Sequence, residues 1–338
     1  MKNIIVVTGG VGFVGSNLIL YLIKKTKFKI ISIDNYSSGS KINQVNNRRV
    51  TYLKSDTREI EKRLKPYLLN IHSLFHFGEF SRIYQSFHYM NECIQSNTIG
   101  TNAVFDYCLK KNVKKIKTVF HFGEFSRIYQ SFLKMNDCIE SNSVGSNAVF
   151  NFCLKYNIKL IYSATSASLG NNGNDKNLSP YAFTKSKNLE LLENLKKWFN
   201  FKYEIIYFYN VYGPHQICKG PMSTVIGIFE DSYKRGKPLP VVKPGTQTRR
   251  FTHIDDTINM CYLAWRKNLC RHYSIANKKS YSILNVAKMF NSKIKFLAKR
   301  PGERYASAII NKNLSNKMYK YFGNINLKDY IKEFTRNN

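Results

Sequence analysis

The sequence predicts an α/β protein built on a doubly wound parallel sheet, with a smaller C-terminal substrate-binding lobe. Short apolar runs alternate with longer amphipathic stretches through the first two-thirds of the 338 residues, and a glycine-rich turn follows the first run. After about Gly213 this rhythm loosens, and Pro and Gly become frequent. Alternation of strands and helices is typical of right-handed βαβ crossovers and a parallel sheet.

The individual elements follow from β-branched apolar runs and from stretches with helical periodicity. The predicted strands are Ile4–Thr8, Lys29–Ile33, Val50–Lys54, Leu74–Phe77, Val119–Phe122, Lys159–Ser163 and Tyr203–Phe208. The predicted helices are Val14–Lys25, Glu59–Leu69, Tyr181–Phe199, Val225–Lys234, Asp255–Lys267, Ile283–Phe290, Leu314–Tyr321 and Leu327–Phe334. We therefore predict a first domain over residues 1–212 and a lobe over residues 213–338.

One strand-and-helix unit occurs twice in the chain. The string FHFGEFSRIYQSF stands at Phe75–Phe87 and again at Phe120–Phe132, and the similarity extends over residues 75–116 and 120–161. A solenoid normally needs three or more repeats. A local tandem duplication of one βα unit explains the pattern better.

Composition narrows the class of protein. No apolar run is long enough to cross a bilayer, and the opening MKNIIVVTGG favours a buried strand over a secretory signal. Seven cysteines without a CxxC pair favour a reducing cytoplasm over a disulfide framework. The formal charge of +32 admits a nucleic-acid or anionic-membrane partner, but its lysines are scattered without a basic block. That scatter favours solvated lysine faces and steering of an anionic substrate.

A dinucleotide site is predicted at the end of the first strand. Gly9, Gly12 and Gly15 in TGGVGFVGSNL permit a tight turn and close approach of a pyrophosphate to a helix N-terminus. Asp34 ends the second strand, where a carboxylate accepts ribose hydroxyls and repels a 2′-phosphate, so NAD is favoured over NADP. Asp56 follows the third strand and is placed to meet the adenine edge, unless it belongs to a solvated loop.

A second group of residues indicates hydride transfer at a carbinol. Tyr181 and Lys185 in SPYAFTKSKNLE share one helical face. A free phenol has a pKa of about 10, and a nearby ammonium and nicotinamide cation stabilise its anion, so Tyr181 can serve as an acid/base. Thr165 ends an upstream strand, and its hydroxyl could bind the same substrate oxygen.

Together these motifs resemble the extended short-chain dehydrogenase/reductase family, specifically its nucleotide-sugar epimerases and dehydratases. Later segments, Tyr207–Pro214, Arg249–Asp256 and Arg300–Glu303, resemble the substrate-lobe motifs of that family in order. The resemblance covers essentially the whole chain. It implies a Rossmann NAD-binding domain, a tightly held NAD, a nucleotide sugar (UDP-sugar first) as substrate, and a homodimer.

The resemblance also implies roles for individual residues. Tyr181 would be the acid/base, Lys185 would lower its pKa and bind the nicotinamide ribose, and Thr165 would hydrogen-bond the substrate. NAD would be held by Gly9, Gly12, Phe13, Val14, Gly15, Asp34, Asn35, Asp56, Thr57, Phe122, Gly123, Asn142 and Lys185. The nucleotide sugar would contact Ser126, Asn210, Arg249 and Arg300. The cofactor-side asparagine could equally be Asn97, and the two arginines could be ordinary surface charges.

Departures from the family pattern narrow the implied reaction. The dehydratases place an Asp–Glu pair directly after the active-site threonine, whereas this chain has Ser166–Ala167. Epimerisation through a transient 4-keto sugar is therefore favoured over dehydration. A nucleotide-sugar decarboxylase uses the same first step and stays open. So does a non-catalytic NAD- or nucleic-acid-binding protein whose site the duplication has split. Glu79 and Glu124 stand where the family has a small residue.

The repeat creates a conflict within the implied fold. The family places this strand fourth, between the glycine-turn strand and the strand that ends at Thr165. If both copies join the sheet there, the catalytic residues move about 4.8 Å further from the glycine turn, which would impair hydride transfer. We predict that the second copy takes the working position and that the first is an extra packed unit. A hybrid of the first strand with the second helix is the alternative.

Overall fold

The computed structural model describes residues 3–37, 39–78, 91–92, 95–110, 118–126, 128–220, 223–267, 272–299, 318–320 and 323–338. The chain forms two compact units, Met1–Gly123 and Glu124–Asn338. The division falls inside the second copy of the repeat, directly after its strand. The predicted functional division at residues 212 and 213 stays a prediction.

The first unit contains a parallel sheet in the order β3–β2–β1–β4. Its strands are β1 (Ile4–Thr8), β2 (Lys29–Asp34), β3 (Val50–Lys54) and β4 (Ile71–His76). The first three have the predicted bounds to within one residue, whereas β4 begins at Ile71 and not at the predicted Leu74. All five residues of β1 are buried because it is a central strand with covered faces, as its unbroken apolar run indicates. Helix α1 (Phe13–Lys25) follows β1 and carries the glycine turn at its start.

The predicted helix Glu59–Leu69 is broken into three short pieces. They are the 3₁₀ turn η2 (Thr57–Glu59), helix α2 (Ile60–Leu64) and the 3₁₀ segment η3 (Lys65–Asn70). Pro66 stands in the first turn of η3, and proline lacks the N–H that a continuous α-helix would need there.

The helix of the first copy covers the sheet of the first unit. It consists of the π-helical segment η4 (Gln95–Gly100) and α5 (Thr101–Lys110). Buried Val104, Tyr107 and Cys108 of α5 share one apolar cluster with residues of β1 and β2. The first copy is therefore an integral part of this unit.

The strand of the first copy, β4, pairs with β1. The strand of the second copy, β5 (Thr118–His121), lies against β4 through equivalent rings. The ring centroids of Phe75 and Phe120 are 5.0 Å apart, and those of Phe77 and Phe122 are 5.9 Å apart. Our prediction that the second copy adjoins the glycine-turn strand is wrong. The short η2–α2–η3 crossover brings the first copy to β1 before the second copy begins, in keeping with short connections between neighbouring elements.

The second unit contains a further run of parallel strands, in the order β14–β11–β7–β6. They are β6 (Lys159–Thr165), β7 (Tyr203–Phe208), β11 (His272–Ser274) and β14 (Met318–Lys320). The predicted helix Leu314–Tyr321 is wrong over Met318–Lys320, where pairing with buried β11 overrides local preference. The other residues of that predicted helix, 314–317 and 321, lie outside the described part of the chain.

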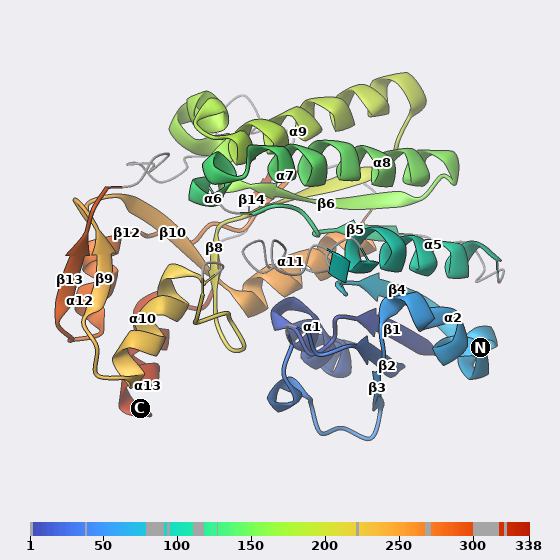
Figure 1. Cartoon of the computed structure of the whole chain (residues 1–338), viewed down its shortest axis with the longest axis horizontal. Helices are drawn as coiled ribbons and strands as arrows, with labels where there is room; N and C mark the ends of the chain where they lie inside the picture. Colours follow the sequence, from blue (N-terminus) through green and yellow to red (C-terminus); the bar gives the residue numbers. More distant parts are fainter. Residues whose placement is uncertain are drawn as a thin grey trace. The chain divides into compact units, whose positions relative to one another are not determined.

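Helices of the second copy pack with the helix that carries Tyr181 (Figure 1). They are α6 (Ile128–Leu133), α7 (Met135–Ile139) and the π-helical η5 (Glu140–Gly145), which continues into α8 (Ser146–Lys155). Helix α9 (Pro180–Phe199) begins with Ser179 as N-cap and Pro180 at its first turn, and ends at left-handed Asn200. The 3₁₀ segment η6 (Ser166–Asn177) connects β6 to α9.

The remaining elements of the second unit surround an apolar cluster of their own. They are β8 (Asn210–Tyr212), α10 (Val225–Lys234), β9 (Leu239–Val242), β10 (Thr248–His253), α11 (Ile254–Arg266), β12 (Ser280–Ser282), α12 (Ile283–Met289), β13 (Ile294–Leu297) and α13 (Leu327–Arg336). Phe229, Phe251 and Phe290 lie at the centre of this cluster. Among the described residues, no helix combines the length and apolarity needed to span a membrane.

Candidate active site

The glycine turn of the first unit is shaped by two steric requirements. Gly9 has φ +67°, and a Cβ on it would lie 2.5 Å from the carbonyl carbon and oxygen of Phe77. A Cβ on Gly15 would lie 2.2 Å from the carbonyl oxygen of Gly9, so α1 packs directly on the turn. Gly12 is the N-cap of α1 and offers no side-chain cap. This helix N-terminus therefore retains N–H groups that a phosphate can use.

Asp34 supports the turn and keeps capacity for a ligand. Its two carboxylate oxygens accept hydrogen bonds from the N–H groups of Val11 (3.0 Å) and Tyr36 (2.8 Å). Burial raises the pKa of Asp34, and these two hydrogen bonds oppose the rise. Each oxygen retains a lone pair for a ribose hydroxyl.

Asp56 belongs to a small polar group that also contains Asn35 and Arg58. It accepts hydrogen bonds from Asn35 Nδ2 (3.2 Å) and from Arg58 Nε (2.8 Å). Burial alone would raise the pKa of Asp56, but the hydrogen bonds from Arg58 and Asn35 outweigh burial and lower it. Thr57 is buried, with Gly78 and Gly100 closely packed against its side chain.

The other NAD residues of the first unit differ in exposure. Phe13 and Val14, in the first turn of α1, and Phe122 are half-buried, whereas Gly123 is exposed. An uncapped helix N-terminus beside a buried carboxylate with free lone pairs fits the pyrophosphate and ribose of NAD. The individual contacts to NAD stay predictions.

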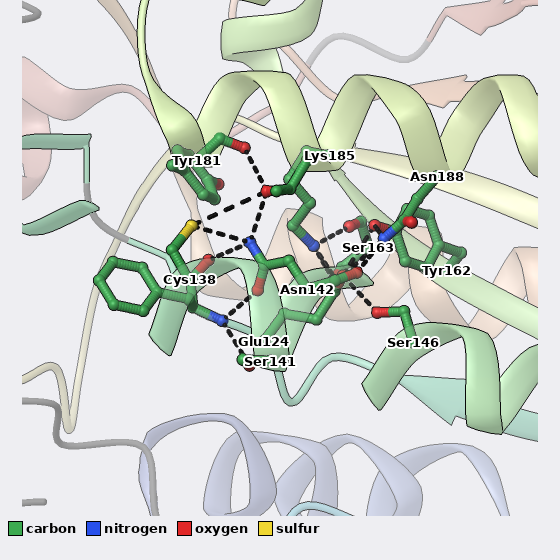
Figure 2. Close-up of polar contacts among 12 residues, drawn as sticks. Glu124, Cys138, Ser141, Asn142, Ser146, Tyr162, Ser163, Tyr181, Lys185 and Asn188 are labelled. Carbon is green, nitrogen blue, oxygen red and sulfur yellow. Dashed lines mark hydrogen bonds and ion pairs between the residues drawn. The ribbon is translucent and has the colours of Figure 1, made fainter. Parts of the chain in front are cut away.

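The three catalytic candidates lie in the second unit, close to its parallel strands (Figure 2 shows Tyr181 and Lys185). Thr165 is the last residue of β6, and its Oγ1 accepts the N–H of Ala167 at 3.1 Å. Tyr181 stands in the first turn of α9, where its N–H donates to Ser131 Oγ at 3.2 Å. Lys185 follows one turn later, and all three residues are buried.

The ammonium of Lys185 is paired with a buried carboxylate. It donates to Glu124, to the carbonyl oxygen of Ser163 (2.6 Å) and to Ser163 Oγ (3.3 Å). The side chains of Lys185 and Glu124 are 3% and 1% exposed. Burial lowers the pKa of Lys185, and the Glu124 carboxylate opposes this change. Sequence reasoning noted Glu124 only as a departure, although a carboxylate within the apolar string FHFGEF was the available signal.

Asn142 joins the second copy to α9 and is fully buried. Its Oδ1 accepts the N–H of Phe125 (2.7 Å), while Nδ2 donates to the carbonyl oxygen of Phe125 (3.1 Å) and to Thr184 Oγ1 (3.1 Å). The amide is thus engaged within the second unit, and its assignment to NAD stays a prediction. Asn97 lies in η4 of the first copy.

The substrate candidates are spread over several elements of the second unit. Asn210 and Arg249 lie on neighbouring strands, and Asn210 Nδ2 donates to the carbonyl oxygen of Arg250 at 2.9 Å. Arg249 is half-buried and donates to the carbonyl oxygen of Thr248 at 2.8 Å. Ser126 is exposed, and Arg300 lies outside the described residues.

Comparison with protein families gives a match over most of the chain. The model described as "NAD dependent epimerase/dehydratase family" matches residues 5–117 and, separately, residues 112–276. The first segment contains the first copy of the repeat, and the second segment contains the second copy.

Individual relatives are distant but extend over most of the chain. A UDP-glucuronic acid decarboxylase from Arabidopsis thaliana is 23% identical over 295 residues, or 86% of this chain and 74% of the relative. A UDP-N-acetylglucosamine 4-epimerase from Methanobrevibacter ruminantium, solved with UDP-N-acetylmuramic acid, is 24% identical, with TM-score 0.67 and 99% and 98% of the two chains covered. A UDP-glucuronic acid 4-epimerase from Bacillus cereus, solved with UDP-glucuronic acid and NAD, is 21% identical, with TM-score 0.66 and 99% of each chain covered. The two structures share the fold of this protein.

Proposed function

Because the chain belongs to the NAD-dependent epimerase/dehydratase family, we propose that it is an NAD-dependent nucleotide-sugar 4-epimerase. The observation that carries the proposal is a set of buried side chains, Thr165 at the end of β6 and Tyr181 and Lys185 one turn apart on α9. It supplies two hydroxyls and an ammonium beside a parallel sheet. The glycine turn and Asp34 of the first unit supply the fit to NAD.

In this proposal Tyr181 removes the proton from the sugar hydroxyl as the carbinol carbon is oxidised. Thr165 hydrogen-bonds the same oxygen, and Lys185 contributes positive charge that stabilises the Tyr181 phenolate. Bound NAD⁺ would accept the hydride and return it to the other face of the keto sugar. Tyr181 then gives its proton back to the oxygen, so the cycle needs no external redox partner.

The segment after Thr165 supports epimerisation over dehydration. Ser166 and Ala167 begin η6, and both are buried. Neither carries the carboxylate that elimination of water requires as acid or base. The similarity to UDP-glucuronic acid decarboxylases favours one second candidate, loss of CO₂ from the 4-keto form of a UDP-glucuronate-type substrate.

A homodimer is part of the proposal. Large apolar side chains stand exposed on the helices of the second copy and on α9. They include Ile139 (40% exposed), Val144 (65%) and Phe183 (46%). Such a group of side chains is typical of a surface that a second copy of the chain covers. The proposal also places the protein in the cytoplasm, which suits the free thiols of Cys108, Cys138 and Cys153.

Turnover of UDP-, GDP- and dTDP-sugars by the NAD-loaded full chain tests the proposal, with products identified by NMR. UDP-glucuronic acid belongs in the panel, because CO₂ release from it would identify the decarboxylase instead. The control variant Tyr181→Phe should retain NAD and lose turnover. A chain lacking residues 88–132 carries a single copy of the repeat and shows whether the duplication limits the rate.

We expect the full chain to invert one sugar. Turnover by the shortened chain alone would mean that the duplication has inactivated the enzyme. If neither form acts and the protein retains RNA in a salt-sensitive manner without NAD, the non-catalytic alternative replaces the epimerase.

A further inference from the structure

The ion pair between Glu124 and Lys185 is unusually deeply buried. Both side chains are at most 3% exposed, and ionised groups at such depth need a partner and full hydrogen bonding. The pair joins two distant parts of the sequence, the loop after the second repeated strand and the helix that carries Tyr181.

The Glu124 carboxylate is held by donors from three elements. One oxygen accepts hydrogen bonds from Ser146 Oγ of α8 (2.8 Å), Tyr162 of β6 (2.8 Å) and Asn188 of α9 (3.3 Å). The other oxygen accepts the Lys185 ammonium (Figure 2). A carboxylate satisfied in this way has a single orientation, so it sets the position of the ammonium it binds.

Residues at equivalent positions in the two copies of the repeat form different hydrogen bonds. Ser146 of the second copy corresponds to Thr101 of the first. The Thr101 hydroxyl bonds His76 Nε2 at 2.9 Å within the first unit, whereas the Ser146 hydroxyl bonds Glu124. The two copies therefore have different hydrogen-bond partners despite nearly identical sequences.

We propose that Glu124 is the positioning residue of the catalytic lysine. Its carboxylate keeps the buried Lys185 protonated and in place, and thereby assigns the second copy of the repeat to the Tyr181 helix. The catalytic half of this inference rests on the proposed epimerase activity. The structural half does not.

The surroundings of Lys185 explain why the carboxylate is needed. Among the described residues, the titratable groups that act on the ammonium are Glu124 and Cys138 of α7, and the ring centroid of Tyr162 of β6 lies 4.7 Å from Nζ; Tyr181 stands one turn earlier on the same helix. Cys138 and Tyr162 have raised pKa values, chiefly through burial, so at neutral pH they are uncharged. Glu124 is thus the charge that compensates the ammonium, and without it burial favours the neutral amine.

Stability measured against pH tests the structural half without any substrate. Glu124→Gln removes the charge and keeps the shape, and Glu79→Gln makes the same change in the same 13-residue string of the first copy. Glu79 lies outside the described residues. In Glu124→Gln the pKa of folded Lys185 falls, so the folded state binds fewer protons than the unfolded chain until about pH 10.4, where a free lysine titrates.

The unfolding equilibrium of Glu124→Gln should therefore differ from that of Glu79→Gln by at least tenfold at pH 7, with the gap closing as the pH rises toward 10. Each further unit by which the pKa is lowered is worth another factor of ten. A gap that is independent of pH would overturn the proposal. So would an equal effect of Glu79→Gln, or an effect seen only when both residues are changed, because either result means that the copies are interchangeable.

The pH profile of kcat/KM tests the catalytic half. In Glu124→Gln the alkaline loss of activity should move to lower pH by about one to three units, since an uncharged Lys185 no longer stabilises the Tyr181 phenolate. Glu124→Asp keeps the charge and should restore much of the alkaline limb, while an unchanged profile in Glu124→Gln would refute this role. If no form turns over a sugar, the epimerase assignment fails and the stability experiment still decides the position of Lys185.

Discussion

Substitution of Asn142 distinguishes a role in stabilising the fold from a role in binding the cofactor. Asn142→Ala removes four hydrogen bonds, two to the backbone of Phe125, one to Thr184 Oγ1 and a longer one to Cys138 Sγ at 3.8 Å. The N–H of Phe125 can keep an acceptor, because Ser141 Oγ lies 3.2 Å away. Thr184 Oγ1 keeps the carbonyl oxygen of Pro180 at 2.9 Å. The carbonyl oxygen of Phe125 is the group that loses its hydrogen-bond donor.

Leaving a buried polar group without its partner costs about 1–3 kcal/mol, and the emptied volume adds to this. We therefore expect Asn142→Ala to lower the free energy of unfolding by about 2–4 kcal/mol. Urea denaturation of the NAD-free protein measures the change. Asn147→Ala, on the exposed face of the same helix region, is the matched control and should stay within about 0.5 kcal/mol of the parent.

Unchanged stability in Asn142→Ala would refute the structural role of this side chain. If Asn142→Ala keeps the stability of the parent and instead weakens NAD binding, the amide serves the cofactor, as the family resemblance implies. A loss of stability of the same size with and without saturating NAD would support the structural role.

The remaining predictions concern catalysis, a buried ion pair and assembly. Tyr181→Phe should lower kcat about 10²–10⁴-fold while NAD binding stays unchanged, as measured by turnover and by calorimetric titration. Lys159→Met should lower the free energy of unfolding by about 3–5 kcal/mol in urea denaturation, because it leaves buried Glu204, 3.7 Å away, without its counter-charge and removes the donor to carbonyl oxygens at the end of α11. The control Lys202→Met changes an exposed lysine and should leave stability unchanged; an equal loss there would argue against a role for the Lys159–Glu204 ion pair. Val144→Glu should convert a dimer to monomers in light scattering, and an unchanged mass would exclude η5 from the interface.

Much of the fold could be predicted from local patterns. The strands Ile4–Thr8, Val50–Lys54 and Tyr203–Phe208 have the predicted bounds. Short runs rich in β-branched and aromatic residues can be recognised without distant information, and Ile4–Thr8 and Tyr203–Phe208 are also almost fully buried, whereas Val50–Lys54 is only partly buried. The glycine turn, Asp34, and the shared helix of Tyr181 and Lys185 likewise follow from spacing along one or two neighbouring elements.

The tertiary structure determined which of two equivalent local sequences takes each place in the fold. FHFGEFSRIYQSF has one local preference wherever it occurs, so the sequence alone could not say which copy would pair with β1 or which would meet α9. The crossover from β3 brings the first copy to β1, and the buried pairing of Glu124 with Lys185 joins the second copy to α9. Met318–Lys320 became a strand for the same kind of reason, since pairing with β11 outweighs a helical pattern. A partner distant in sequence settled each of these cases, because the free energy of pairing and burial belongs to both members of a contact.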